Sequence, residues 1–433
     1  MASASNSNAN STDTAVTVER EPYYHGLLPR EDVRLILDKT GDFVIRTTEP
    51  KPGEPRSYVL SVMFDPKADE KDAVKHFVIN SANKKYFMNN NMHFDTMQLM
   101  VSHYVKTNLE IQDGVKIVKA IRRQYWELEH ESIMLTKKLG EGAFGEVSAG
   151  EMKFKRGGKT VQVAVKQAKL EKMGKEQIKG FMHEARMMRQ LGHQNIVKFY
   201  GVAVLQEPLY LVMELASNGA LDDYVKKNDL PMEKLLELLL QAAWGLEYLH
   251  GKPMLHRDIA ARNCLYGDGK VKISDFGLTR KATVYQMNPK AKSPIRWLAV
   301  ETIKAQVNSQ KTDVWSYGIL CWEVFNKGEQ PYPGKTTAEV ASEVIAGYRM
   351  PPVATVSGEV QALMTKCTME NPNERPTMSE IAITLQRLTG IPRPNFAAIA
   401  KKEAEELLLM NTVTIKGGTT KRRNKKAAVP KGM

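Results

Sequence analysis

The sequence of 433 residues is poor in the features that mark secreted and membrane-spanning chains. Its three cysteines, Cys264, Cys321 and Cys367, are too few and too widely spaced for a disulfide framework, which favours a reducing, intracellular setting. It has no run of about 18 apolar residues, so we expect no membrane-spanning helix. The first 20 residues lack both the apolar core of a signal peptide and a glycine after Met1 for myristoylation, and their Ser/Asn/Thr-rich composition predicts a disordered segment.

Negative charge is also scarce. The net charge is +13, and about half of that excess lies between Ala400 and Met433, most densely in KRRNKK, Lys421–Lys426. A solvated tail, contact with an anionic membrane surface, nuclear import and nucleic-acid binding all fit this composition. No aromatic residue follows Phe396, which argues against a stacking platform for single strands and makes nucleic acid the least favoured partner.

The length suits two or three domains, and two globular stretches can be distinguished. In the first, from Glu21 to about Ile121, the runs Ser57–Phe64 and Val74–Asn80 predict strands. Apolar residues at three- and four-residue spacing in Glu31–Lys39 and Phe94–Val105 predict helices. We therefore expect a set of strands flanked by two helices.

A charged connector, RRQYWELEHES, leads to a second stretch from Ile133 to about Leu388. Strand patterns dominate as far as Leu215, interrupted by one predicted helix, EQIKGFMHEARMMRQL, and helical patterns dominate after that. The long segment MEKLLELLLQAAWGLEYLH presents one apolar face, which we interpret as core. The sequence contains no internal repeats.

The segment LGEGAFGEV, Leu139–Val147, contains the pattern G-x-G-x-x-G. A dinucleotide-binding turn has the same letters, but that version opens a helix. Here the glycines lie between two strand-like runs, so Gly140, Gly142 and Gly145 predict a hairpin whose bare backbone can approach phosphate oxygens. A plain flexible hairpin is the alternative, and the glycines alone do not exclude it.

Lys166 ends the apolar run VAVK. A lysine on a buried strand is unfavourable unless it is paired, and Glu184 on the following helix can supply the partner. A lysine held in this way is a fixed point charge for nucleotide phosphates. A surface salt bridge is the alternative, and the apolar neighbours of Lys166 argue against it.

Chemistry-bearing side chains gather in HRDIAARN, His256–Asn263, and in the DFG that follows. Asp258 can orient an acceptor hydroxyl and take its proton, which is typically worth about 10²–10⁴-fold in rate. Asn263 and Asp275 offer the oxygen ligands that suit a hard cation such as Mg²⁺ bridging phosphates. We interpret His256 as a structural residue that packs below the loop.

These segments occur in the order and spacing of one large family. GEGAFGEV, VAVK, the helix glutamate, HRDIAARN, DFG, an APE-like WLAVE and DVWSYG follow one another, and the stretch Ile133–Leu388 resembles a protein kinase. The resemblance implies a bilobal domain that uses ATP with Mg²⁺ (or Mn²⁺). Val300 stands where the family usually has proline in the APE motif, and we expect this difference to affect stability more than activity.

The resemblance also implies the surroundings of the nucleotide. The hinge that meets the adenine edge would be Glu214–Ala216, with Met213 gating the pocket behind it. A structural clamp between Glu301 and Arg375 is implied as well. In addition to the three glycines and Lys166, the positions implied for ATP binding are Leu139, Val147, Ala164, Met213, Glu214, Ala216 and Leu265.

The catalytic loop resembles the tyrosine-specific branch of the family. Ser/Thr kinases have a lysine at the position of Ala260, whereas this loop has Arg262 four residues after Asp258. By resemblance, Arg262 serves the substrate side and leaves room for a phenol. The segment SPIRWLAVE, with Pro294 and Trp297, is similar to the platform that lies under the acceptor ring in tyrosine kinases.

The activation segment, Asp275–Glu301, contains a single tyrosine, Tyr285. A phosphate there would add about −1.5 to −2 charges and could pair with Arg257 and nearby basic residues. We therefore expect autophosphorylation of Tyr285 to raise activity. An incidental loop tyrosine is the alternative.

The first stretch places an arginine where burial requires an anion. Arg46 follows apolar residues on a predicted strand, and its planar guanidinium can hold two phosphate oxygens at once. An internal salt bridge is the alternative. The segment GDFVIRTTE resembles the FLVRES strand of the Src-homology-2 (SH2) domain, and YYHGLLPRED, KHFVI and FDTMQLMVSHY match other parts of it. The resemblance implies phosphotyrosine binding by Arg30, Arg46, Thr48 and His76.

An SH2 domain followed directly by a tyrosine kinase most resembles the Fes/Fer cytoplasmic kinases. The fold class predicted is α+β, with an SH2 domain, a central antiparallel sheet flanked by two helices, followed by a bilobal protein-kinase domain. The expected boundaries are a disordered N-terminus at 1–20, the SH2 domain at 21–121, a linker at 122–132, the kinase domain at 133–390 and a basic tail at 391–433.

The predicted activity is transfer of the ATP γ-phosphate to protein tyrosine hydroxyls, with the SH2 domain binding phosphotyrosine-containing proteins. The alternative is a phosphotyrosine-binding scaffold with an inactive kinase fold. From the family we also expect the SH2 domain to lie on the helix of Glu184 and support the active state. We expect a cytoplasmic protein, associated with membranes if the basic tail binds anionic lipid. The enzyme is favoured because the whole catalytic set is present: Lys166, Glu184, Asp258, Asn263 and Asp275.

Overall fold

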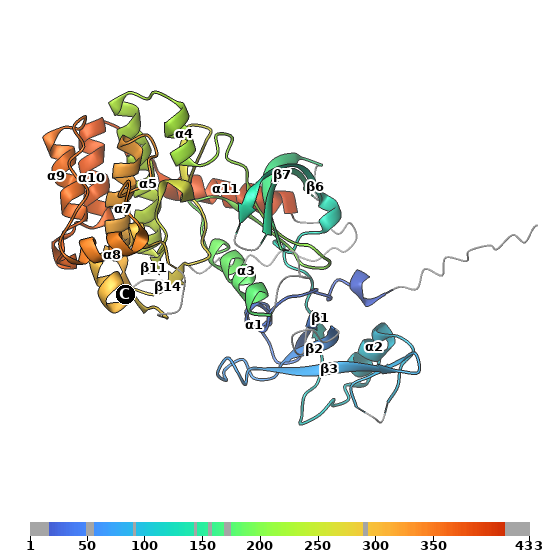
Figure 1. The fold of residues 1–433 in the computed structure, drawn as a ribbon. Coiled ribbons are helices and arrows are strands. Elements are labelled where there is room, and N and C mark those ends of the chain that lie inside the picture. The colour runs from blue at the N-terminus through green and yellow to red at the C-terminus, as the bar shows by residue number, and fades with distance from the viewer. Residues whose placement is uncertain are drawn as a thin grey trace, which may run out of the picture.

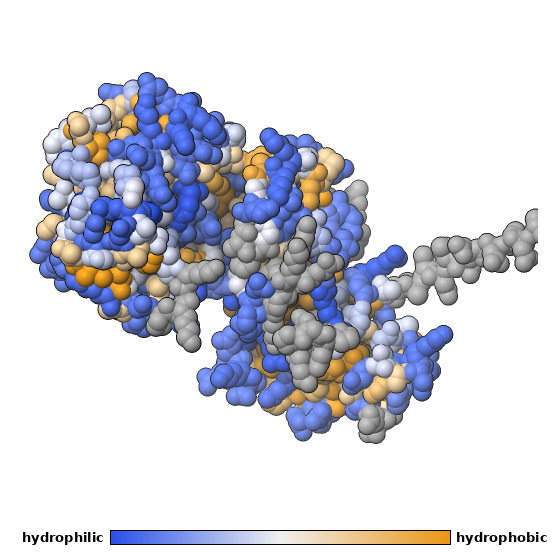
Figure 2. All heavy atoms as spheres, viewed as in Figure 1, coloured by the Kyte–Doolittle hydropathy of each residue, from blue (hydrophilic) through white to orange (hydrophobic). Residues whose placement is uncertain are grey.

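A computed structural model of the chain describes residues 17–48, 56–89, 92–142, 145–154, 158–168, 175–288 and 293–411. The described residues form three globular parts: a small N-terminal domain, a lobe made mainly of strands, and a larger helical lobe (Figures 1 and 2). Most of the predicted disordered N-terminus and the KRRNKK segment lie outside the described residues. Residues 17–20 do not fit that prediction, because Val18–Arg20 form a 3-10 helix with Val18 buried in the N-terminal core.

The N-terminal domain is a five-stranded sheet between two helices. The sheet order is β4-β3-β2-β1-β5, antiparallel except that the short β5 runs parallel to β1. Phe43 and Ile45 of β1 belong to the core on the side of α2, whereas Val44 belongs to the core on the side of α1, as strand alternation requires. The elements are α1 Arg30–Ile36, β1 Asp42–Thr48, β2 Ser57–Met63, β3 Val74–Ala82, β4 Lys85–Phe87, α2 Met97–Thr107 and β5 Lys119–Ala120.

The helix limits differ from those predicted by a few residues. The helix predicted from Phe94 begins at Met97, because the Thr96 side chain accepts a hydrogen bond from the Leu99 amide (3.1 Å) and caps it. It ends where Asn108 adopts a left-handed conformation. The first helix begins at Arg30, directly after Pro29, and ends three residues before the predicted Lys39.

The strand-rich lobe is an antiparallel sheet with the order β6-β7-β8-β10-β9 and one long helix, α3. The succession of strands, one helix and two more strands is the one predicted from the sequence. The elements are β6 Ile133–Gly142, β7 Gly145–Lys153, β8 Thr160–Ala168, α3 Lys175–Met188, β9 Phe199–Ala203 and β10 Leu209–Glu214.

The helical lobe is built around α5 and α7, which are buried on more than one face. The single apolar stripe predicted for α5 is therefore too narrow, since Leu238, Leu240 and Ala243 are buried as well. Among the described residues of this lobe, short strands form three two-stranded sheets: β11 with β14, β12 with β13, and β15 with β16. The helices are α4 Leu221–Lys227, α5 Met232–Gly251, α6 Val300–Ala305, α7 Gln310–Phe325, α8 Thr337–Ile345, α9 Gly358–Cys367 and α10 Met378–Thr389. The strands are β11 Met254–Leu255, β12 Cys264–Gly267, β13 Lys270–Ile273, β14 Arg280–Lys281, β15 Val284–Gln286 and β16 Val307–Ser309.

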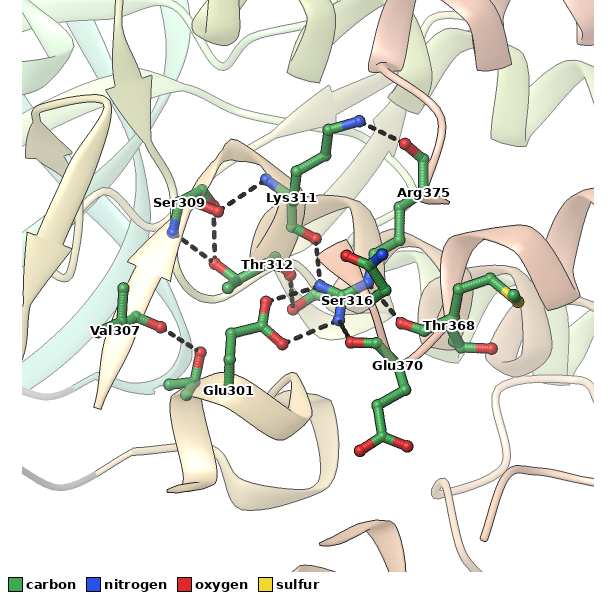
Figure 3. A network of polar contacts seen from close by, with 12 residues as sticks. Glu301, Val307, Ser309, Lys311, Thr312, Ser316, Thr368, Glu370 and Arg375 are labelled. Atoms are coloured by element: carbon green, nitrogen blue, oxygen red, sulfur yellow. Dashed lines mark hydrogen bonds and ion pairs between the residues drawn. The ribbon is translucent and has the colours of Figure 1, made fainter. Parts of the chain in front are cut away.

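The clamp expected between Glu301 and Arg375 is present (Figure 3). The two Nη atoms of the buried Arg375 donate to the two carboxylate oxygens of Glu301 at 2.7 and 2.8 Å. The same guanidinium donates to the carbonyl oxygens of Lys311 and Met369 (2.9 and 2.8 Å). The neighbouring Val300 begins α6 and is buried, so the residue that replaces the usual proline contributes to the core.

The segment assigned to the basic tail begins as part of the kinase fold. Helix α11, Phe396–Asn411, crosses from the helical lobe to the strand-rich lobe (Figure 1). At one end the Phe396 ring lies 4.2 Å from His193 and 5.5 Å from Trp244, measured between centroids. Further along, Leu407 packs on the apolar cluster of the strand-rich lobe. Helix α11 therefore contacts both lobes.

The N-terminal domain lies against α3, as expected from the family (Figure 1). Asp32 of α1 is buried and accepts hydrogen bonds from Nε and Nη2 of Arg186 on α3, at 3.1 and 2.8 Å. Apolar residues of both elements, Val33 of α1 and Phe181 of α3 among them, share one cluster. The contact therefore combines a bidentate ion pair with buried apolar surface.

Candidate functional site

The glycine segment forms the hairpin predicted between β6 and β7, with Gly142 paired to Gly145. Gly145 has φ 147°, and a Cβ there would lie 2.6 Å from the carbonyl oxygen of Gln167, so a larger residue would not fit. Register aligns Gly140 with Val147, and Val147 with Lys166 on β8. The hairpin and the lysine predicted to meet phosphate therefore form one row across three strands.

Lys166 and Glu184 are brought together. Their Nζ and Oε2 atoms are 2.7 Å apart, and the residues are 6% and 2% exposed. The surface salt bridge considered from the sequence therefore does not describe this pair. Burial opposes the charge of Lys166, but Glu184 and then Asp275 outweigh it and raise the pKa of the ammonium group. The lysine is held as a cation.

The catalytic loop is fixed from below by α7. The Asp313 carboxylate accepts hydrogen bonds from the backbone amides of His256 (2.9 Å) and Arg257 (2.8 Å). His256 is fully buried, with Nε2 3.0 Å from the carbonyl oxygen of Ser274 and its ring centroid 5.3 Å from that of Phe276. This agrees with a structural interpretation of His256.

Asp258 lies beside Arg262, whose Nη2 donates to its Oδ1. Burial raises the pKa of the Asp258 carboxyl, against the opposing effect of Arg262. The Arg262 guanidinium lies 4.1 Å from the centroid of Trp297. Trp297 in turn donates from Nε1 to Glu323 (3.0 Å), which also accepts from the Ala261 amide (3.0 Å). The acid and the arginine of HRDIAARN therefore meet the tryptophan of SPIRWLAVE at one place.

Glu323 was not singled out in the sequence. Burial raises the pKa of its carboxyl to about 7. Its position on α7, after the DVWSYG motif, gives no local signal of a role, because the contact with Trp297 exists only in the folded chain.

Asn263 and Asp275 have the chemistry that a divalent metal requires. The Asn263 amide donates from Nδ2 to the carbonyl oxygen of Asp258 (2.8 Å), which leaves its Oδ1 as the ligand atom. A Cβ placed on Gly277 would lie 3.3 Å from Oδ1 of Asp275 and 3.8 Å from Oε2 of Glu184, so these carboxylates converge beside that glycine. An oxygen donor set of this kind fits Mg²⁺ or Mn²⁺.

The positions implied for the adenine pocket lie on facing strands. Ala164 of β8 is directly paired with Met213 of β10. The Glu214 side chain is engaged within the protein, since it accepts from the Lys198 amide (2.6 Å) and pairs with Lys272 (2.9 Å). The Glu214 amide also donates to the carbonyl oxygen of Lys198 (2.9 Å), so a ligand would meet the other backbone groups of the hinge. Leu139, Val147, Ala216 and Leu265 are at least partly exposed and lie on or next to the strands and hinge described above.

Tyr285 lies between two arginines. Its ring centroid is 4.6 Å from the guanidinium of Arg257 and 5.4 Å from that of Arg280. Burial and then the neighbouring Arg280 lower the pKa of Arg257. Sequence reasoning did not name Arg280. It reaches this place because Arg280 of β14 is paired with Leu255 of β11, just before the catalytic loop.

A second site lies in the N-terminal domain. A cavity of about 500 Å³ is lined by all four residues predicted to bind phosphotyrosine: Arg30, Arg46, Thr48 and His76. Arg46 is 3% exposed and donates from Nε to the Ser61 hydroxyl (3.1 Å), which also lies 2.9 Å from Nδ1 of His76. Within the described part of the chain Arg46 makes no ion pair, so the internal salt bridge considered above is not found there. Arg56 also lines this cavity and was not predicted.

The pKa values in this cavity show an excess of positive charge. Burial and then Arg30 lower the pKa of Arg46 to about 10. Burial, Arg46 and Arg30 together lower the pKa of His76 to about 3. Cations that destabilise one another in a concave site are stabilised by an anionic ligand.

Comparisons with known proteins agree with both sites. Residues 133–385 match the family model of protein tyrosine and serine/threonine kinases. The chain belongs to this family. Residues 23–104 of the kinase match the SH2 domain model, so a phosphotyrosine-peptide-binding module precedes the catalytic domain. The predicted fold class is confirmed.

Relatives match the chain over most of its length. The kinase is 38% identical over 385 residues to Fer-related kinase 1 of Caenorhabditis elegans, covering 87% of this chain and 95% of the relative. It is 38% identical over 368 residues to human tyrosine-protein kinase Fer, covering 83% of this chain and 43% of the relative. The Fps transforming protein of Fujinami sarcoma virus is 33% identical over 370 residues, 84% of this chain and 40% of the relative. The kinase thus spans nearly all of the nematode relative and less than half of the human and viral ones, and the predicted Fes/Fer resemblance is confirmed.

Membership of the kinase family implies use of ATP with a divalent metal and of protein substrates. Among the helices of the described residues, we find none with the length and apolar character needed to cross a bilayer.

Proposed function

We propose that this Fer-type kinase transfers the γ-phosphate of ATP to tyrosine hydroxyls of proteins, and that its SH2 domain brings it to phosphotyrosine-containing partners. The observation that carries the proposal is the meeting of Asp258, Arg262 and Trp297. An arginine that reaches the catalytic acid from four residues downstream, and rests on a tryptophan, suits a flat phenol at the acceptor position. The tyrosine-kinase names of relatives such as human Fer point the same way.

The side chains divide the work of phosphoryl transfer. Lys166, held by Glu184, positions the phosphates, and Asp258 orients the acceptor hydroxyl and takes its proton. The raised pKa of Asp258 makes it a stronger base than an exposed aspartate. Asn263 and Asp275 would hold Mg²⁺ or Mn²⁺, which when bound neutralises phosphate charge.

The test is transfer of labelled phosphate from ATP to a tyrosine peptide, with Asp258→Asn as the matched variant. We expect wild-type protein to label the peptide and Asp258→Asn to be slower by about 10²–10⁴-fold. Equal rates for the two proteins would show that Asp258 does not act as the base. Absence of transfer from wild-type protein under activating conditions would leave the alternative, a phosphotyrosine-binding scaffold, which no structural observation favours.

We further propose that autophosphorylation of Tyr285 raises activity. Arg257 and Arg280 already flank the ring, and a phosphate on its hydroxyl would give both guanidinium groups an anionic partner. Peptide phosphorylation by Tyr285→Phe is expected to be slower than by wild-type protein after preincubation with ATP. Unchanged activity would show that Tyr285 is incidental.

We also propose that the kinase acts in the cytoplasm. The three cysteines are buried free thiols, in keeping with a reducing compartment. The further suggestion that the basic tail contacts an anionic membrane concerns KRRNKK, which lies outside the described residues.

A further inference from the structure

The cavity of the SH2 domain has a wall that does not belong to the SH2 domain. Ile178 and Lys179 of α3, in the kinase domain, line the same space of about 500 Å³ as Arg30 and Arg46. The figure places α1 and α3 next to each other, which is consistent with a shared cavity at their junction (Figure 1). A ligand that fills this space touches both domains.

The charge of the α3 wall matches that of the SH2 walls. Lys179 is near enough to Arg30 and Glu31 for both to affect the pKa of its ammonium group. Its partner in the structure is Glu176, 2.9 Å away on the same helix, in a pair whose side chains are 41% and 83% exposed. Exposed pairs of this kind contribute little to stability, so Lys179 can exchange Glu176 for a phosphate without a large penalty.

Among the described residues, the part of the cavity wall formed by β3 carries no lysine or arginine. Val78 lines the cavity from β3 and is 47% exposed. The positive side chains that line the cavity are Arg30 of α1, Arg46 of β1, Arg56 just before β2 and Lys179 of α3. One acidic residue, Glu31 of α1, lines it as well, so positive charge is in excess.

The position of Lys179 is fixed by the contact between the domains. Arg186 follows it on α3 by seven residues, two helical turns, so the two side chains lie near one face of the helix, and Arg189 comes directly after the helix ends. Arg186 and Arg189 both pair with the buried Asp32 of α1, at 2.8 and 3.8 Å. The pairing that joins α3 to the SH2 domain therefore also presents Lys179 to the cavity.

We propose that the phosphotyrosine site is composite, with the kinase domain supplying Lys179 to the ligand's phosphate and Ile178 to the wall of the pocket. This inference rests on the proposed binding of phosphotyrosine peptides by the SH2 domain. It adds that affinity is set partly by a residue of the catalytic domain, so the complete chain binds more tightly than the SH2 residues alone would permit.

The test is a fluorescence-anisotropy titration of the full chain with a labelled tyrosine-phosphorylated peptide. Lys179→Glu is expected to raise Kd by about tenfold or more, because a charge-assisted contact is replaced by repulsion. Lys179→Arg should remain within about threefold of wild type, because the charge is kept. The matched control is Lys106→Glu, which makes the same charge change at an exposed position on α2 that does not line the cavity. It should remain within about twofold, since exposed charges beyond a Debye length are largely screened.

Two further measurements separate this inference from the function on which it rests. Arg46→Ala should abolish binding, and an unphosphorylated peptide should not bind. If Arg46→Ala binds normally, phosphotyrosine recognition at this site is wrong. If Arg46→Ala fails to bind while Lys179→Glu matches Lys106→Glu, the SH2 site is real and the composite site is wrong. Thermal melting of each variant checks that the fold is retained.

Discussion

The kinase has two proposed phosphate sites, and the two sites organise their cations differently. In the catalytic cleft each cation has an internal carboxylate: Lys166 has Glu184, and Arg262 has Asp258. In the phosphotyrosine pocket, Arg46 is held by the Ser61 hydroxyl and faces other cations. The cleft is thus arranged before a nucleotide arrives, whereas among the described residues the pocket has more cations than carboxylates, with Glu31 the acidic residue that lines it.

The pKa shifts of the cations also differ between the catalytic cleft and the pocket. The pKa of Lys166 is raised because its carboxylate neighbours outweigh burial, whereas burial and Arg30 lower the pKa of Arg46 to about 10. Removing a cation should therefore have opposite consequences at the two sites. In the cleft it leaves a buried carboxylate without its partner, and in the pocket it relieves repulsion.

The largest expected effect is on stability, at the cleft. Lys166→Met should lower the free energy of unfolding by about 3–5 kcal/mol, because Glu184 is left buried without its partner. The double variant Lys166→Met/Glu184→Met should recover much of that loss, since no charge remains without a partner. Denaturant unfolding of the single and double variants measures both values, and equal stability of Lys166→Met and wild type would contradict the comparison.

The next effect is on binding, at the pocket. Arg46→Lys should weaken phosphotyrosine-peptide binding by about 10–100-fold, because an ammonium group cannot hold two oxygens as the guanidinium does. Stability should change little, since no internal carboxylate among the described residues depends on Arg46. Unchanged affinity would show that Arg46 does not bind the phosphate. A large loss of stability would show that Arg46, like Lys166, has a structural partner within the protein.

A smaller effect concerns pH. His76 has a pKa of about 3 in the fold and an ordinary value of 6.5, so the unfolded chain takes up a proton in this range and the folded chain does not. Stability contributed by neutral His76 is present above pH 6.5 and is lost progressively as the pH falls from 6.5 towards 3. The slope from this group cannot exceed about 1.4 kcal/mol per pH unit. The contribution of His76 is isolated by measuring the free energy of unfolding of His76→Gln and wild type between pH 7 and 5. Parallel curves for the two proteins would show that His76 is not held neutral.

The smallest effect tests the link between the two regions. Asp32→Asn keeps the shape of the side chain but removes the charge that holds Arg186 and Arg189. We expect peptide phosphorylation to slow by a few-fold, because α3 also carries Glu184 and loses part of its support. Steady-state kinetics measures the change. An unaltered kcat would show that the SH2 contact does not support the active state.

Residues that belong to short ordered motifs could be placed from the sequence. Lys166, Asp258 and Arg46 were assigned to sites because each stands in a segment whose neighbours specify a strand or loop. The helices were predicted with approximate limits, because their ends are set by caps such as the Thr96 hydroxyl rather than by apolar spacing.

Contacts made only by tertiary packing were beyond sequence reasoning. Arg280 reaches Tyr285 through a strand pair, and Lys179 reaches the SH2 cavity through a contact between domains. The segment after residue 390 is basic, and its sequence alone leaves open whether FAAIAKKEAEELLLM forms a helix that docks on the kinase or on lipid. In the structure, Phe396 and Leu407 anchor α11 on both lobes. The net charge of such a helix is set mostly by its solvent-exposed side chains. It gives no information about the few apolar residues that attach the helix to the rest of the protein.

We propose that the acceptor site beside Asp258 takes a phenol. The direct measurement is the rate of phosphate transfer from ATP to three peptides that are identical except for Tyr, Ser or Phe at the acceptor position. If the site accepts a phenol, we expect transfer to the tyrosine peptide alone. Transfer to the serine peptide at a comparable rate, or no transfer to any of the three by activated wild-type protein, would contradict it.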